Sequence, residues 1–357
     1  MTTATAPSPF ACSYTPQIPE LLRQLDCTLV ISTFQAGKVI FISPKDDEHL
    51  IQLPRTFRQP MGIAYSAPKM AVATKDEVIV LSNSPELAAH YPKQPNTYDA
   101  LFMPRATYYT GQVDIHDLLW STDGLLAVNT SFSCICRIGE DFSFGPVWHP
   151  PFIDKLASED RCHLNGMILI NGRPKYVTAL STTNVFQGWK NGLPGNGVLM
   201  DVETGEVVVR NLQMPHSPRL FRDELFVLMS ATGELAKAHV TDGTLEVVRP
   251  LEGFVRGFAI HGEYAFIGMS KLRKNSSSFG KLPIAEKAVH SGIEVIHLPT
   301  GAWVGRIRYE ASVDEIYDVQ VMAGIRRPGI VNTEGDMHKM GLSIPGATYW
   351  AQPKKEP

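Results

Sequence analysis

Three histidines lie in three stretches of similar kind. His116 lies in Val113–Leu118, His163 in Arg161–Gly166 and His216 in Met214–Arg219, and each stretch leads into a short apolar run. Neutral imidazole is a common metal ligand, and three imidazoles with one carboxylate suit Zn²⁺, Fe²⁺, Mn²⁺ or Cu²⁺. The sequence therefore predicts a divalent-metal site whose ligands are His116, His163, His216 and Glu315.

Further polar residues stand in related stretches. Arg256 in Phe254–Phe258 would hold an anionic substrate group, because a guanidinium binds carboxylate or phosphate through two parallel hydrogen bonds. Asn165 and Tyr317 would orient the substrate. The candidate catalytic residues are Glu315, Arg256 and Tyr317, and the candidate substrate-binding residues are Arg256, Asn165, Asp114 and Gln59.

The chemistry of such a site stays open at this level. A bound metal could activate water for hydrolysis or bind O₂ for oxidation. Imidazole ligation suits iron or copper better than calcium, which favours an oxidoreductase or oxygenase, with zinc, manganese and calcium as the other metals. Histidines in a channel also serve by hydrogen-bonding neighbours or ordered water, and no local HExxH or GxSxG motif is present.

The polar stretches recur at intervals of roughly 40 to 60 residues, with two or three strands between them, which is typical of a propeller of four-stranded blades. Aligning the stretches by the turn after each inner strand gives two rings at one mouth of the channel. One ring holds Met61, His116, Asn165, Ser217, Arg256 and Tyr317, and the other holds Gln59, Asp114, His163, Pro215, Phe254 and Glu315.

The count of strands predicts an all-β, six-bladed β-propeller. Its last blade would be closed by N-terminal strands that join an inner strand from the C-terminal end, which removes free sheet edges. The expected organisation is an arm over 1–26, one propeller domain over 27–324 and a tail over 325–357 that packs on the propeller. Two insertions interrupt the regular spacing of the strands and are candidates for functional loops. They are Thr182–Gly197 and Lys271–Ser291.

Composition narrows the class of protein. The chain has 357 residues, 44% apolar and 19% charged, with a net charge of −3 and no basic stripe, so we expect no nucleic-acid partner. No apolar run approaches the ~18 residues of a membrane helix, so no membrane partner is expected either. The N-terminus lacks an apolar signal-like region, and the five cysteines are odd in number and scattered, so a cytoplasmic location is expected.

Four phrases carry a resemblance to a known family: Ser32–Lys38, Arg161–Gly166, Met214–Arg219 and Arg256–Ala259. They resemble a family of bacterial conserved hypothetical proteins, over nearly the whole chain, and that family has no secure activity. The architecture is also similar to six-bladed propellers of the gluconolactonase and strictosidine-synthase type.

Those lactonases hold a divalent ion with Glu, Asn and Asp across the channel. Glu315 and Asn165 could serve in that way here, but the histidines dominate and disfavour a calcium lactonase. Besides the metal-dependent oxidoreductase, the open alternatives are a metal-dependent lactonase or hydrolase, a metal-free module that binds a small molecule or peptide, and a scaffold that uses its blade rims.

Overall fold

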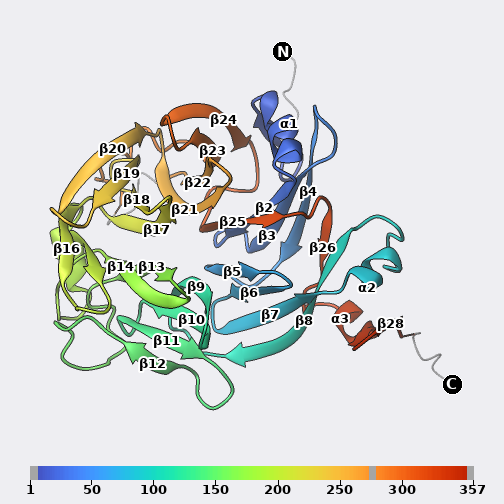
Figure 1. Cartoon of the computed structure of the whole chain (residues 1–357), viewed down its shortest axis with the longest axis horizontal. Coiled ribbons are helices and arrows are strands. Elements are labelled where there is room, and N and C mark those ends of the chain that lie inside the picture. The colour runs from blue at the N-terminus through green and yellow to red at the C-terminus, as the bar shows by residue number, and fades with distance from the viewer. Residues whose placement is uncertain (1–6, 273–278, 352–357) are drawn as a thin grey trace.

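The computed structural model describes residues 7–272 and 279–351, whose strands form six main sheets around a central axis (Figure 1). Each sheet is one blade, and blades are numbered from β5, the first innermost strand in chain order. Neighbouring strands within the four-stranded core of each blade pair antiparallel. The predicted six-bladed β-propeller is confirmed.

The strands of blades 1 to 3 follow one another from the axis outward. They are β5 (Ile63–Ser66), β6 (Lys69–Ala73), β7 (Glu77–Asn83) and β8 (Ala100–Tyr109), then β9 (Ile115–Ser121), β10 (Gly124–Asn129), β11 (Cys134–Ile138) and β12 (Gly145–Trp148), then β13 (Leu164–Ile170), β14 (Arg173–Ala179), β15 (Gly197–Asp201) and β16 (Val207–Leu212).

Blades 4 and 5 are built in the same way. They contain β17 (Pro215–Phe221), β18 (Glu224–Met229), β19 (Glu234–His239) and β20 (Thr244–Pro250), then β21 (Phe254–His261), β22 (Tyr264–Ser270), β23 (Ser291–His297) and β24 (Ala302–Tyr309).

Blade 6 closes the ring with strands from both ends of the chain. Its inner strand β25 (Asp318–Ala323) pairs with β2 (Cys27–Thr33), which is followed by β3 (Lys38–Pro44) and β4 (Leu50–Thr56). The pairing runs from Cys27 with Ala323 to Ser32 with Asp318. This is the closure that the sequence predicts.

Segments outside the blades cover sheet edges. β1 (Cys12–Tyr14) extends blade 5 beside β24, and α1 (Gln17–Gln24) buries Ile18 and Leu22 against blades 5 and 6. Toward the other end, β26 (Pro328–Ile330) pairs in parallel with β8. The outermost residues of the predicted arm and tail, 1–6 and 352–357, lie outside the described residues.

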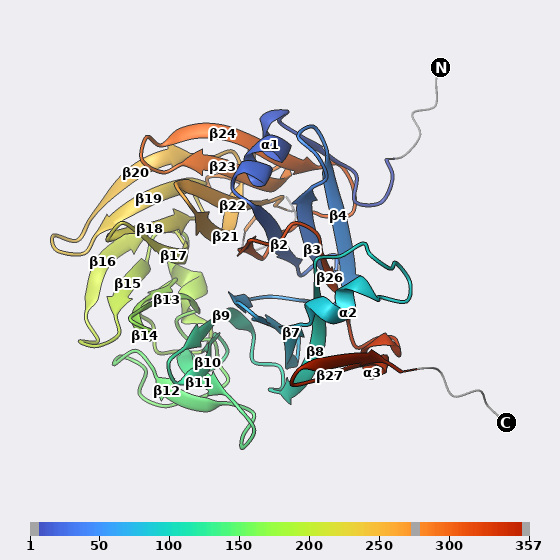
Figure 2. The same ribbon diagram turned by 45° about the vertical axis from the view of Figure 1, so that its right-hand side comes forward.

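A small C-terminal subassembly packs against blade 1 (Figure 2). It consists of α3 (Met337–Met340) and the hairpin of β27 (Gly341–Ile344) and β28 (Ala347–Trp350). The Trp350 Nε1–H donates a 3.1 Å hydrogen bond to the Leu87 carbonyl of α2 (Pro85–Ala89). In the part of the chain that the structure describes, no helix has both the length and the apolar character needed to cross a bilayer.

The apolar core is divided into layers between neighbouring blades. Six buried clusters each join residues of two adjacent blades, as in the layer that joins Val30 and Phe41 of blade 6 to Ile63 and Val72 of blade 1. Blades therefore bury both faces, which explains why β2 is buried along its whole length. Burial of this kind holds the inner strands at fixed positions around the channel.

Three charged side chains tie the inner strands together in pairs. The Asp117 carboxylate of blade 2 accepts from the Met167 N–H of blade 3 at 3.1 Å, and Asp318 of blade 6 accepts from the Ile63 N–H of blade 1 at 2.8 Å. Arg219 of blade 4 donates through Nε–H to the Phe258 carbonyl of blade 5 at 2.8 Å. Every second blade thus carries a charged side chain that hydrogen-bonds the backbone of the next blade. These three side chains, Asp117, Arg219 and Asp318, are called clamps below.

Candidate functional site

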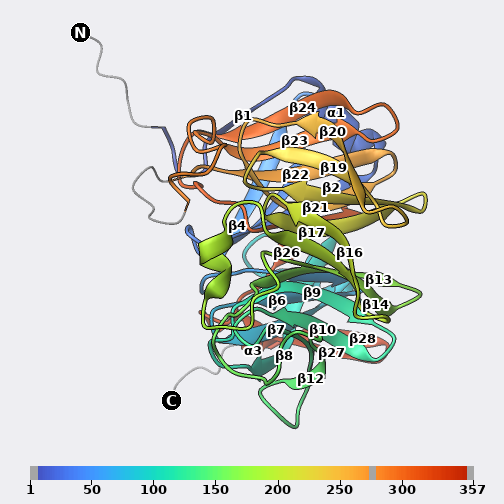
Figure 3. The same cartoon turned by 90° about the vertical axis from the view of Figure 1, so that its left-hand side faces the viewer.

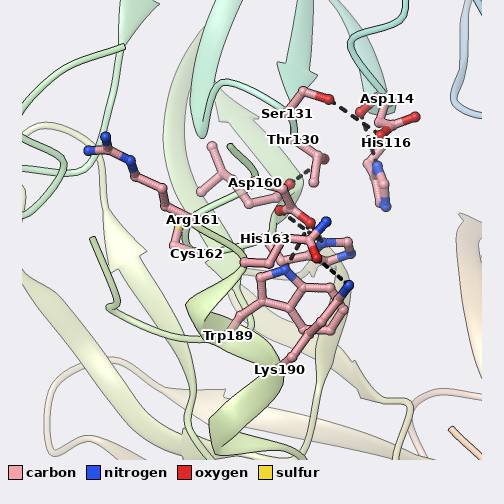
Figure 4. Close-up of polar contacts among 12 residues, drawn as sticks. Asp114, His116, Thr130, Ser131, Asp160, Arg161, Cys162, His163, Trp189 and Lys190 are labelled. Carbon is pink, nitrogen blue, oxygen red and sulfur yellow. Dashed lines mark hydrogen bonds and ion pairs between the residues drawn. The ribbon is translucent and has the colours of Figure 1, made fainter. Parts of the chain in front are cut away.

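Two of the three predicted histidines are in direct contact. The ring centroids of His116, on β9, and His163, just before β13, are 4.9 Å apart with an edge-to-face arrangement (Figure 4). Their blades are neighbours, so residues near the starts of the two adjacent inner strands lie close together.

His163 is held by a carboxylate and an indole. Its Nδ1 lies 2.9 Å from the Asp160 carboxylate, which also accepts a 2.8 Å hydrogen bond from Trp189 Nε1–H (Figure 4). Trp189 lies in the 3₁₀ helix η1 (Gly188–Gly192) of the first insertion, and its ring stacks on His163 with centroids 4.3 Å apart. This helical turn, yellow-green in Figure 3, projects from the left side of the disc. The insertion therefore fixes the orientation of the imidazole.

The other two histidines are oriented by backbone carbonyls. His116 Nδ1 lies 3.1 Å from the Asp114 carbonyl, and His216 Nδ1 lies 3.0 Å from the Met214 carbonyl and 2.8 Å from Ser230 Oγ. Because carbonyl and carboxylate oxygens only accept, Nδ1 carries the proton in all three rings. Nε2 is then the lone-pair nitrogen wherever the imidazole is neutral.

Both His116 and His216 are neutral at physiological pH. Burial lowers the pKa of each imidazole well below its ordinary value, and the positive charge of Arg256 lowers both further. The site therefore offers uncharged imidazoles beside one fixed cation.

Arg256 occupies a bulge near the start of β21. The register of β21 against β22 shifts between Val255 and Phe258, and Gly257 takes the left-handed φ of +76°. This re-aims Arg256 so that its guanidinium carbon lies 3.4 Å from the Tyr317 ring centroid. The Glu315 carboxylate is 3.7 Å from Nη1, which is an ion pair but longer than a hydrogen bond.

Three buried donors among the predicted site residues have no acceptor among the described residues. They are Nη2 of Arg256, the hydroxyl of Tyr317 and Nδ2 of Asn165. Burial also raises the pKa of the Tyr317 phenol, so its O–H stays protonated. Leaving a buried donor without a partner costs about 1–3 kcal/mol, so each of the three groups would be stabilised by an added acceptor.

A pocket of about 790 Å³ opens beside Arg256. That volume is within the roughly 300–1,000 Å³ of small-molecule sites. Its lining combines polar groups with an apolar flank that includes Phe34, Met214, Phe254 and Leu272. Five of the predicted site residues also line it, namely Gln59, His163, His216, Arg256 and Glu315.

The other four predicted residues take different places. Tyr317 lies against Arg256, His116 lies against His163, and Asn165 accepts from the Thr178 hydroxyl at 2.6 Å. The exposed Asp114 carboxylate accepts from the Ser131 hydroxyl at 3.3 Å, so its closest link to the site is the carbonyl that orients His116.

The four predicted metal ligands are not gathered into one site. Among the described residues, no group of three or more His, Cys, Asp or Glu side chains is arranged to hold a metal ion. His216 packs against Phe254 and bonds Ser230, while Glu315 lies beside Arg256. Equivalent strand positions bring the residues to one mouth, but the packing of each side chain separates them.

Sequence reasoning missed several residues that shape the site. Asp160 and Trp189 were not among the predicted site residues, yet together they orient His163. The sequence also did not predict the roles of Ser230 or of the Lys271–Asp314 ion pair, whose charged atoms are 2.8 Å apart. The tryptophan of a long insertion was the available signal, since loops of that length are often functional.

A family model described as "Domain of unknown function (DUF4915)" matches residues 16–331. The chain belongs to this family. The resemblance to conserved hypothetical proteins is thereby confirmed, and no curated protein matches the sequence. For this DUF4915 member, the family therefore identifies the chain without assigning a reaction.

Three solved structures are similar to this chain at low sequence identity. A protein of unknown function from Bacteroides caccae has a TM-score of 0.50 and 10% identity, over 83% of this chain and 99% of that one. A nidogen/laminin complex gives a TM-score of 0.49 and 10% identity over 84% and 99%. Apo AztD from Citrobacter koseri gives 0.42 and 13% over 88% and 89%. At these identities the Bacteroides likeness shows the fold alone.

Proposed function

We propose that this DUF4915 protein binds a small anionic molecule at the channel mouth, with Arg256 as the anchor for the anionic group. The observation that carries the proposal is the guanidinium of Arg256, whose buried Nη2 has no acceptor among the described residues. A carboxylate or phosphate oxygen would supply that acceptor and form a charge-assisted hydrogen bond.

The surroundings of Arg256 support an anion rather than a cation. Stacking on Tyr317 holds the guanidinium plane in place, and its 14% exposed side chain is only weakly screened by solvent. The hydroxyl of Tyr317 and Nδ2 of Asn165 add neutral donors to the same ring of inner-strand residues. Because His116 and His216 are neutral, the charge that an anion would meet beside them is that of Arg256.

The test compares 3-phenylpropionate with its neutral isostere 3-phenylpropanamide by titration calorimetry. Wild type should bind the carboxylate at least about tenfold more tightly, since a hydrogen bond to a charged group contributes about 1.5–3 kcal/mol. Arg256→Met keeps an apolar stem on Tyr317 and should abolish the preference. Lys271→Met is the matched control, because Lys271 lines the pocket but is already paired with Asp314.

A wider panel makes the proposal easy to contradict. Carboxylates and phosphate monoesters of increasing size would be titrated against wild type and both variants. If no member binds in an Arg256-dependent way up to millimolar concentration, the channel mouth is not an anion site and the orphaned donors are satisfied by water.

A second candidate is the metal-dependent enzyme expected from the sequence, either an oxidoreductase or a lactonase-like hydrolase. It is favoured by the shared protonation of Nδ1, which leaves Nε2 of His116, His163 and His216 able to bind a metal. Glu315 would be a fourth ligand or a base, and Tyr317 would orient the substrate. Side chains would have to move for His216 and Glu315 to join the histidine pair. A cytoplasmic location likewise stays a prediction.

A further inference from the structure

Glu315 is an acidic group that the channel mouth leaves without a hydrogen bond. Its nearest cation is Arg256, at 3.7 Å, and among the described residues no hydrogen bond reaches its carboxylate. The side chain is 32% exposed and lines the same pocket as Arg256. The pocket therefore presents a positive and a negative group side by side, each with free hydrogen-bonding capacity.

The backbone around Glu315 is held on both sides. The next residue, Ile316, donates its N–H to Ser270 Oγ at 3.0 Å, and Tyr317 donates its N–H to the Ser32 carbonyl at 2.8 Å. The preceding Asp314 N–H donates to Gln35 Oε1 at 3.3 Å. These backbone hydrogen bonds hold the chain at Glu315 in place, and the Glu315 carboxylate therefore lies beside Arg256.

The other charged pair in the pocket lining is already satisfied. Lys271 Nζ lies 2.8 Å from the Asp314 carboxylate, which is hydrogen-bond distance. The contrast with the 3.7 Å separation of Arg256 and Glu315 shows which charges remain available to a ligand.

Apolar side chains lie on the remaining side of the pocket. Phe254 is 7% exposed and Met214 is 1% exposed, while Phe34 and Leu272 are partly buried. Such a surface favours a ligand with a sizeable apolar body, at about 25 cal/mol for each Å² of apolar surface removed from water.

We infer that the pocket takes a free α-amino acid with a large apolar side chain. The inference rests on the proposed anion site. The carboxylate binds Arg256, the ammonium group binds Glu315, and the side chain lies against the apolar flank. An α-amino acid fits because its two opposite charges sit on one carbon, and the two protein charges that would meet them are 3.7 Å apart.

Titration calorimetry of four probes tests the inference. They are phenylalanine, 3-phenylpropionate without the amine, phenethylamine without the carboxylate, and N-acetylphenylalanine. In wild type we expect phenylalanine to bind at least about tenfold more tightly than each of the others, because each lacks one charge-assisted contact. Glu315→Gln should remove the advantage over 3-phenylpropionate while leaving the affinity for 3-phenylpropionate equal or higher.

The matched control is Asp314→Asn, which removes a neighbouring carboxylate that lines the same pocket but serves Lys271. This variant should keep most of the preference for phenylalanine. Equal, Arg256-dependent binding of phenylalanine and 3-phenylpropionate would overturn the amino-acid inference and leave the anion site standing. Loss of Arg256 dependence for every probe would instead remove the anion site itself.

Discussion

At the scale of single residues, the channel mouth combines neutral imidazoles with one buried cation. His116 and His216 present Nε2 as a lone-pair nitrogen, which is the state that a metal or a hydrogen-bond donor requires. Burial lowers the pKa of His116 and His216 most, and the positive charge of Arg256 lowers both further. The positive charge of Arg256 repels a divalent cation and attracts an anion, whereas the Glu315 carboxylate 3.7 Å away has the opposite effect.

Metal analysis gives a clear prediction at this scale. Protein purified without chelators should contain far less than one equivalent of iron, copper, zinc or manganese, measured by elemental mass spectrometry. A His116→Ala/His163→Ala variant should give the same result. Near-stoichiometric metal in wild type, lost in that variant but kept in a His239→Ala/His338→Ala surface control, would favour the metal-dependent enzyme instead.

The sequence predicted a set of residues near the channel mouth, but not which contacts their side chains make. Strand periodicity placed His116, Asn165, Arg256 and Tyr317 at equivalent points because position along an inner strand is a local property. Contacts such as Asp160 with Trp189 join a turn to an insertion, and no local pattern encodes them. The expected metal cluster depended on side-chain direction, which packing decides.

At the scale of elements, the inner strands approach one another closely at glycines. A Cβ on Gly257 would lie 2.7 Å from Asp318 Cα on the neighbouring inner strand, and one on Gly62 would lie 3.0 Å from Asp117 Cα. These glycines belong to blades 5 and 1, and each abuts a blade that carries a clamp. The close approach brings Arg256 of one strand over Tyr317 of the next.

Alanine substitutions at two glycines of similar φ isolate this steric effect. Gly257 has φ +76° and a backbone neighbour at 2.7 Å, whereas Gly111 has φ +74° and nothing within 4 Å. Both variants carry the cost of an alanine at positive φ, but Gly257→Ala adds overpacking of about 1–3 kcal/mol. Urea unfolding should therefore show a larger loss for Gly257→Ala. Equal losses would mean that the strands separate freely.

Strand order and closure were largely readable from the sequence. Apolar runs separated by turns gave the blades, and the unpaired strands at the two ends predicted that β2 joins β25, as observed. Short or exposed outer strands such as β12 were missed, because Gly145–Trp148 lacks an apolar alternation. The parallel addition of β26 to β8 is a long-range pairing that leaves no local trace.

At the scale of the whole molecule, the three clamps meet in the channel. Arg219 Nη1 lies 3.6 Å from the Asp117 carboxylate, and the charge of Asp318 acts on that of Asp117. Burial is the main cause that raises the pKa of Asp117, to about 6, and Asp318 raises it further while Arg219 lowers it. Burial also raises the pKa of Asp318. Two carboxylates thus share one guanidinium inside the ring, and closure of the ring carries an electrostatic cost.

That cost makes the stability of the propeller depend on pH in a predictable direction. The pKa of Asp117 is about 6 in the folded chain and about 3.9 in an unfolded one, so between these values the folded state holds the extra proton. The free energy of unfolding, relative to Asp117→Asn, should therefore fall by up to about 3 kcal/mol as pH rises from 4 to 7. Urea unfolding at pH 4.5 and 7 measures this change.

Asp336→Asn is the control, because the exposed ion pair with Lys339 lowers the pKa of Asp336 and gives a pH dependence of opposite sign. A wild type that gains stability relative to Asp117→Asn as pH rises would show that Arg219 outweighs burial and that the central charges hold the ring closed.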